Sequence, residues 1–177
     1  GLCWSFAATS SIESNILSQP SLSAQAGDNP SIDLDLSEGG NSWYVFTNFD
    51  DENSILYDDF INDPSKGTDG GFPYYVAEGL SAGYGTYPEN LLPYDNYDSG
   101  YSEALRFYSN YRLKDYTELT NDTDLIKQKI MENGAVAVHY NCYNANTYMV
   151  DGMQSYYDDG TPIDGMVDQS HIVTIVG

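Results

Sequence analysis

Apolar residues recur at helical spacing in three parts of the chain. Residues 4–17 mix small residues with bulky apolar ones and have no wholly polar face, which is typical of a buried helix. Pro73 suits the first turn of a helix that continues through Leu80. The clearest helix has a capping residue at Asp122, an apolar stripe, and a terminator at Gly134. These patterns predict helices through most of the first two-thirds of the chain.

β-rich runs dominate the last third. Residues 135–140 and 171–176 are rich in β-branched and apolar residues and predict two strands, and residues 111–119 are a further strand candidate. Turn-forming residues predict loops and turns at 18–35, 63–71 and 84–99, and short helices are expected within 42–61 and 102–108. The order of the elements predicts an α+β fold, with a helical lobe over residues 1–112 and a β-rich lobe over residues 113–177.

Composition narrows the possible partners. The 177 residues include 27 acidic and 6 basic ones, so the formal net charge is -21. A surface of this charge repels phosphate backbones, which argues against nucleic acid as a partner. No apolar run approaches the roughly 20 residues that a membrane span needs. The hydrophobic content of 41% is that of a globular domain, and we expect a monomer.

The residues that could bind a metal or form a disulfide are few. The two cysteines, Cys3 and Cys142, allow at most one disulfide, and the simplest interpretation of Cys142 is a free, partly buried thiol. Acidic clusters at 50–52, 58–59 and 158–159 do not have the spacing of a calcium-binding loop. The two cysteines and the two histidines are far apart in the sequence, and no two of them form the close pair that is typical of a zinc site. The sequence therefore predicts no metal and no cofactor.

Cys3 directly precedes the first predicted helix. A cysteine attacks as its thiolate, and both a helix N-terminus and a neighbouring imidazolium favour that form. A small buried residue is the simpler interpretation of the position alone, because free cysteine is among the most buried residue types. The flanking residues favour the nucleophile.

Six short segments resemble motifs of the papain-like cysteine proteases, in the family's order. They are residues 1–7 (GLCWSFA), 36–38 (LSE), 69–73 (DGGFP), 92–94 (LPY), 134–138 (GAVAV) and 170–177 (SHIVTIVG). Leu2 departs from the small residue usual at that position, and residues 18–35 and 42–66 match poorly and resemble acidic insertions. The resemblance implies a two-lobe fold truncated at both ends. It also implies an exported protein, extracellular or at the cell surface, of the type that bacteria secrete.

The sequence has two histidines, and they are competing candidates for the catalytic base. Spacing in this family places the histidine roughly 130–150 residues after the cysteine, an interval that contains His139 but not His171. Context favours His171, because it opens a β run that ends in Val-Gly. Insertions can account for the longer spacing, since loops lengthen at little cost. We therefore assign the base to His171.

The resemblance also implies roles for other residues. Cys3 attacks the peptide carbonyl, and its own backbone N–H stabilises the oxyanion. A glutamine donor and an orienting asparagine would lie outside residues 1–177, so the fragment alone is expected to be a poor enzyme. Gly70 and Gly71 would hydrogen-bond an extended peptide. Phe72, Pro73 and His139 would line the pocket for the second substrate residue and make it more polar than usual.

Three alternatives remain open from the sequence. A transglutaminase-like or cell-wall amidase fold would also use a Cys–His pair, but it lacks the Gly-Gly-Phe-Pro segment in this order. A catalytically inactive papain-like binding or surface module would keep the fold without the chemistry. An acidic structural domain with coincidental motifs is the third. The leading prediction is a cysteine peptidase that acts on peptides or proteins.

Overall fold

The computed structural model describes residues 1–47, 64–142, 147–156 and 169–177. It confirms an α+β fold, in which helices precede two small antiparallel sheets. The α-helices are α1 (Cys3–Ser18), α2 (Pro20–Ser23), α3 (Pro30–Asp33), α4 (Glu38–Trp43), α5 (Pro73–Ser81) and α6 (Thr123–Asn133), and the 3-10 helices are η1 (Pro64–Asp69), η2 (Tyr94–Ser99) and η3 (Glu103–Leu105). The strands are β1 (Val136–Cys142), β2 (Thr147–Val150), β3 (Met153–Tyr156) and β4 (Gln169–Ile175).

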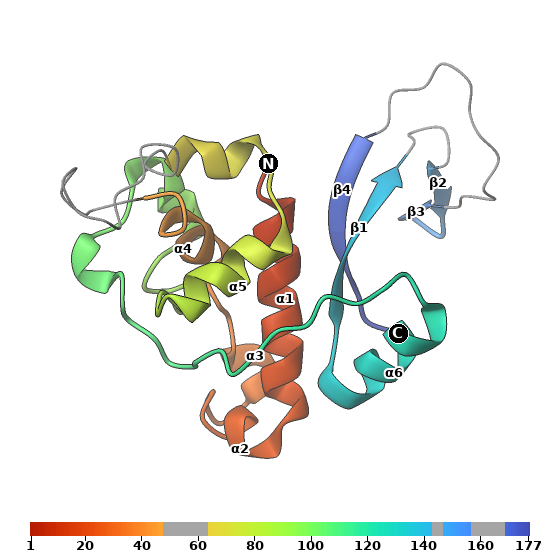
Figure 1. Cartoon of the computed structure of the whole chain (residues 1–177), viewed down its shortest axis with the longest axis horizontal. Helices are drawn as coiled ribbons and strands as arrows, with labels where there is room; N and C mark the ends of the chain where they lie inside the picture. The colour runs from red at the N-terminus through yellow and green to blue at the C-terminus, as the bar shows by residue number, and fades with distance from the viewer. Residues whose placement is uncertain (48–63, 143–146, 157–168) are drawn as a thin grey trace.

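Helix α1 is the centre of the molecule. Figure 1 shows it between α5 on one side and the β1–β4 pair on the other, and α1 packs against both. Its buried residues include Ala7 and Ile16, which are two and a half turns apart and therefore point to opposite sides of the helix. Being covered on several sides explains why the sequence of α1 has no wholly polar face.

A polar stripe on α1 connects it to α4 and to the segment before α4. Ser5, Thr9 and Glu13 are spaced four residues apart and therefore share one side of the helix. Ser5 Oγ donates to the Glu38 carbonyl at 2.7 Å, and Thr9 Oγ1 accepts from Asn41 Nδ2 at 3.0 Å. Glu13 Oε1 accepts from the Leu36 backbone N–H at 2.7 Å. Hydrogen bonds to buried partners fix the rotation of α1 about its own axis.

Strands β1 and β4 form an antiparallel pair that lies along α1. His139 pairs with Ile172, and Ala137 pairs with Thr174. Thr174 Oγ1 donates to the Ala7 carbonyl at 3.2 Å. Nearer the C-terminal end of α1, Ser11 Oγ donates to the Ala135 carbonyl at 2.7 Å. The pair is therefore attached to α1 at two levels.

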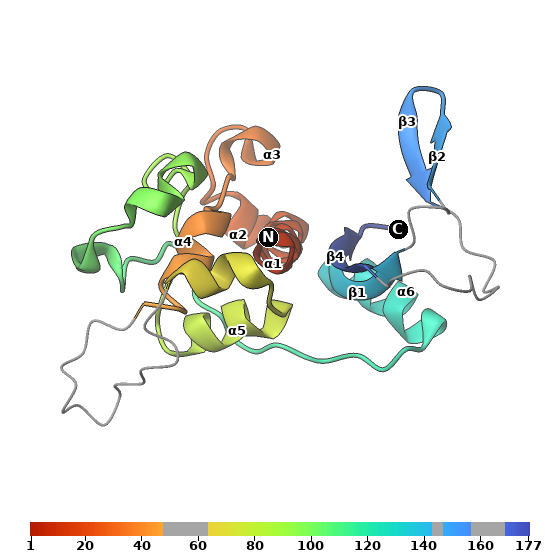
Figure 2. The same cartoon turned by 90° about the horizontal axis from the view of Figure 1, so that it is seen from above.

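The second sheet is the β2–β3 hairpin. Its two-residue turn has positive φ at Asp151 (51°) and Gly152 (80°), the conformation that suits a tight hairpin. Seen from above in Figure 2, the hairpin projects away from the β1–β4 pair. The sequence patterns did not predict this hairpin.

The core lies mainly among the helices. A cluster of buried side chains joins α1, α4, α5 and the segments around residues 87–97, and β4 contributes Ile172. The division into lobes at residues 112 and 113 falls in the connection that leads to α6, and it stays a prediction.

Several predicted elements agree with the structure. The helices at 4–17, 73–80 and 122–134 correspond to α1, α5 and α6, and the strands at 135–140 and 171–176 correspond to β1 and β4. The α6 boundaries follow the expected chemistry, because Asp122 accepts hydrogen bonds from two first-turn amides and Gly134 has a φ of 93°.

Other predictions were wrong or incomplete. Residues 111–119 form no strand and belong to the connection to α6 (Figure 2), because no strand in the described part of the chain lies beside them to pair with their backbone. The predicted loop at 18–35 contains α2 and α3, each with proline in its first turn. The regions expected as turns at 63–71 and as irregular chain at 84–99 contain η1 and η2. Helix α4 begins at Glu38, before the predicted range, and residues 48–61 lie outside the described residues.

Candidate functional site

Cys3 is the first residue of α1. The residue before it, Leu2, caps the helix without any side-chain hydrogen bond. The first backbone hydrogen bonds of the helix run from the Ser5 and Phe6 amides to the Leu2 carbonyl, at 2.9 and 3.1 Å. The amides of Cys3 and Trp4 thus precede the helical ladder, at the positive end of the α1 dipole. This position is as the sequence predicts, and the Cys3 thiol is half-buried.

The register between helix and strands places Cys3 opposite Ile172. Cys3 lies one turn before Ala7, whose carbonyl accepts from Thr174. The four residues from Cys3 to Ala7 advance about 6 Å along the helix, and two strand residues advance about 6–7 Å. Moving back one turn from Ala7 therefore corresponds to moving two residues from Thr174, which reaches Ile172. The packing agrees, because Leu2 and Ile172 belong to one buried cluster and Cys3 packs against it.

His171 is next to Ile172 in β4 and is exposed to solvent. Alternate residues of a strand point to opposite faces, so His171 lies on the face away from α1 while Ile172 and Thr174 face the helix. There the His171 ring approaches the ring of Tyr140 from β1, with centroids 5.9 Å apart. The structure therefore brings the His171 backbone to the level of Cys3 but turns its side chain to the other face of the strand pair.

His139 lies on the face of the pair that looks toward α1. It is directly opposite Ile172, and cross-strand partners share a face. Its Nε2 atom forms a hydrogen bond with Ser170 Oγ. Both histidines thus lie at the level of the Cys3 end of α1, with their side chains on opposite faces of the strand pair, and neither forms a hydrogen bond with Cys3 in the part of the chain that the structure describes.

The glycine-rich segment packs on the first turn of α1. Trp4 Nε1 donates to the Gly67 carbonyl at 3.0 Å. A Cβ on Gly71 would lie 2.8 Å from the Trp4 ring, so only glycine allows this close approach. Gly70 has a φ of 116°, and a Cβ there would have no neighbour within 4 Å. Since Trp4 follows Cys3, both glycines lie close to the predicted nucleophile.

Phe72 and Pro73 continue from these glycines into α5. Pro73 occupies the first turn of α5. The Phe72 side chain is 48% exposed and stacks on Tyr74, with ring centroids 5.6 Å apart. An exposed aromatic ring beside an open backbone segment can contact an extended peptide. His139 belongs to the other side of α1, in β1.

Sequence patterns did not identify Ser170 and Tyr140 as neighbours of the two histidines. These contacts follow from the pairing of β1 with β4, and no local signal in either strand specifies that register. The polar stripe of Ser5, Thr9 and Glu13 was also missed, although the four-residue spacing of these residues is a local signal for it.

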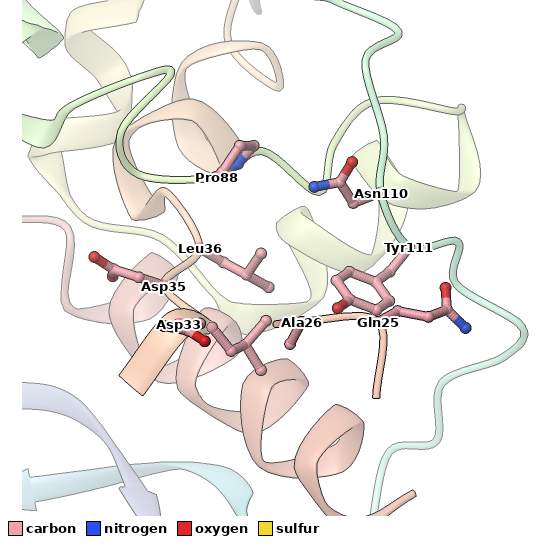
Figure 3. A pocket seen from close by; sticks show the side chains of 9 residues that line it. Gln25, Ala26, Asp33, Asp35, Leu36, Pro88, Asn110 and Tyr111 are labelled. Atoms are coloured by element: carbon pink, nitrogen blue, oxygen red, sulfur yellow. The ribbon is translucent and has the colours of Figure 1, made fainter. Parts of the chain in front are cut away.

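A cavity of about 220 Å³ lies elsewhere on the helical part (Figure 3). Its lining includes Asp33, Leu36, Pro88 and Tyr111, and it contains none of the site residues predicted from the sequence. No cluster of three or more metal-ligating side chains occurs in the ranges that the structure describes, and none of the described helices is long and apolar enough to cross a membrane.

No protein-family model matches the chain, and no solved structure gives a significant match. The fold and this site define an α+β protein with a half-buried cysteine at the start of its central helix.

Proposed function

We propose that this chain contains the catalytic core of a papain-like cysteine peptidase, with Cys3 as nucleophile and His171 as base. We also propose that the fold is the papain-like two-lobe fold, with a helical lobe over residues 1–112 and a β-rich lobe over residues 113–177. The observation that supports it best is the convergence at the first turn of α1. Cys3 begins the helix, residues 67–72 pack on its first turn through Trp4, and β4 approaches through Ile172.

The chemistry uses groups of this chain in defined roles. The Cys3 thiolate attacks the carbonyl carbon of a peptide bond, and the Cys3 N–H donates to the resulting oxyanion. His171 gives a proton to the leaving amine as the C–N bond breaks, which leaves a thioester on Cys3. Water, deprotonated by His171, then hydrolyses the thioester and restores the thiol.

Substrate would lie across the first turn of α1. The backbone of Gly70 and Gly71 can hydrogen-bond an extended peptide, and Phe72 offers an exposed ring beside it. Pro73 and His139 complete the pocket for the second substrate residue in this proposal. We further propose an exported, monomeric protein that acts on peptides or proteins.

The orientation of the two histidines bears on the choice between a peptidase and an inactive module with the same fold. The His171 side chain is on the face of the β1–β4 pair away from α1, so it must rotate around the strand to reach Cys3. This orientation is the specific observation in favour of a binding or surface module without catalysis. His139, on the α1-facing side, is the competing base.

Labelling with a peptidyl epoxide tests these assignments. Such a reagent alkylates an activated thiol far faster than an ordinary one. A Cys142→Ser background leaves Cys3 as the only thiol, because the sequence has two cysteines. We expect one label per molecule, no label after Cys3→Ala, and labelling at least about 10-fold slower after His171→Ala. His139→Ala is the comparison for the competing base, and it should slow labelling less than His171→Ala does, because His139 only lines the substrate pocket in this proposal.

Two outcomes would change the assignment. If His139→Ala slows labelling and His171→Ala does not, the base is His139. The rate of alkylation at Cys3, divided by the rate at a small free thiol, can be measured with the epoxide and with an unspecific alkylating reagent. If this ratio is no higher with the epoxide, the inactive module is the better description.

A further inference from the structure

The cavity in Figure 3 lies between the segment that holds α2 and α3 and the segments around residues 88 and 110. Leu36 and Pro88 line it and form an antiparallel bridge between their two segments. The Glu89 N–H continues this pairing, because it donates to the Asp35 carbonyl at 2.9 Å. Hydrogen-bonded backbone therefore bounds the cavity on this side, and its shape does not depend on a ligand.

Apolar and aromatic side chains make up much of the lining. Leu36 is only 2% exposed, and Tyr111 is half-buried. The Tyr111 N–H donates to Thr86 Oγ1 at 3.3 Å, which holds Tyr111 beside the bridge. Figure 3 shows the Tyr111 ring projecting toward Ala26, which belongs to the segment between α2 and α3. A ligand with an apolar body can thus contact both an aliphatic side chain and an aromatic ring.

The charge of the lining is negative. Asp33 and Asp35 both line the cavity and are exposed to solvent. Asp33 Oδ2 accepts from the Asn29 N–H at 2.7 Å, and a Cβ on Gly27 would lie 2.5 Å from the same oxygen, so the carboxylate is held against Gly27. No lysine or arginine belongs to the lining among the residues that the structure describes. A positively charged group is therefore the complementary one.

We propose that this cavity binds a small organic cation, an ammonium group on an apolar or aromatic body. The volume sets the size of the ligand, because a water-sized group occupies about 30 Å³ and about 220 Å³ therefore holds roughly seven to eight non-hydrogen atoms. The ammonium group lies near Asp33 and Asp35, and the body contacts Leu36 and the face of Tyr111, which itself attracts a cation. The site does not depend on whether Cys3 is catalytic.

Three probes separate this cavity from the general attraction of an acidic protein for cations. The net charge of -21 attracts every cation, whatever its shape. Benzylamine has both the charge and an aromatic body, methylamine has only the charge, and benzyl alcohol has only the body. A built site prefers benzylamine to both of the others, whereas a merely acidic surface binds the two amines equally.

NMR titration of the amide signals of the full chain, in about 0.15 M salt to screen the exposed charges, measures this preference. We expect benzylamine to shift the signals of Ala26, Asn110 and Tyr111 with a Kd on the order of 1 mM. Methylamine and benzyl alcohol should each bind at least about 5-fold more weakly. Nα-acetyl-lysine amide distinguishes two sources of the same cation. Tighter binding than benzylamine assigns the site to a lysine side chain of a peptide, and weaker binding assigns it to a free amine.

Three variants locate the site. Asp33→Asn keeps an acceptor for the Asn29 N–H but removes the charge, so benzylamine should bind about 2- to 5-fold more weakly. Glu78→Gln is the matched control, because it removes a charge from an exposed position on α5 outside the cavity, and it should bind benzylamine as the parent does. Ala26→Leu fills part of the cavity and should weaken binding at least about 10-fold.

The titration of the parent protein decides the proposal even if a variant does not fold. The proposal is overturned if benzylamine and methylamine shift the same signals with equal affinity, or if benzyl alcohol binds as tightly as benzylamine. Shifts spread over exposed carboxylates away from the cavity would also overturn it, as would unchanged binding of benzylamine by a folded Ala26→Leu variant.

Discussion

Replacing Ile172 tests whether β4 is held in place by its contact with α1. The Ile172 side chain is 5% exposed and belongs to the buried cluster that contains Leu2, Trp4 and Ala7 of the α1 region. It is the residue through which β4 reaches the level of Cys3. An Ile172→Ala change removes three carbon atoms from this contact and leaves the backbone pairing with His139 intact.

The expected loss of stability follows from burial. Each buried methylene or methyl group contributes about 0.8 kcal/mol, so three contribute about 2.4 kcal/mol before any cavity remains. The cavity term extends the range to about 2–5 kcal/mol, and Ile172→Val should cost only about 0.5–1.5 kcal/mol. Val176→Ala is the matched control near the end of the same strand, because Val176 is 76% exposed and should change stability by less than about 0.5 kcal/mol.

Urea denaturation followed by circular dichroism measures all three variants. The three free energies of unfolding should fall in the order Val176→Ala, Ile172→Val, Ile172→Ala, from most to least stable. Equal values for Ile172→Ala and Val176→Ala would refute the packing of β4 on α1. In that case the placement of Cys3 opposite Ile172 would also fail, because it was derived from the same contact.

Two further predictions concern the attachment and the boundaries of α6. Gly134→Ala should cost more than about 2 kcal/mol in urea denaturation, because φ is 93° and a Cβ would lie 2.9 Å from the Ser14 backbone. Gly152→Ala, whose Cβ would meet nothing within 4 Å, should cost only the strain of its positive φ, about 1 kcal/mol; equal costs would contradict the close approach to Ser14. Asp122→Ala should cost about 1 kcal/mol, because the cap loses hydrogen bonds of 3.0 and 3.1 Å, whereas Asp122→Asn should retain most of the stability. The epoxide labelling of Cys3 completes the set.

The polar stripe of Ser5, Thr9 and Glu13 shows what burial of α1 requires of its polar residues. A helix covered on several sides must satisfy any polar side chain it carries with partners from its neighbours. Ser5 and Thr9 find partners in the α4 region, and Glu13 accepts a hydrogen bond from the Leu36 N–H.

The sequence by itself determined the elements whose signals are local. The cap at Asp122 and the terminator at Gly134 fixed α6, and Pro73 marked the start of α5. The small and bulky residues of α1 indicated a buried helix, and β-branched runs indicated β1 and β4. Each of these signals acts over one or two turns of chain, so it needs no knowledge of distant partners.

Only the tertiary structure decided which faces and which distant segments meet. It paired His139 with Ile172, turned His171 to the opposite face, and left residues 111–119 without a partner strand. It also brought Glu13 to the segments that hold Glu38 and Glu89. A shift of one residue in strand register reverses every side chain in the strand, and local sequence does not encode that register. The choice between the two histidines therefore depends on long-range packing rather than on either motif.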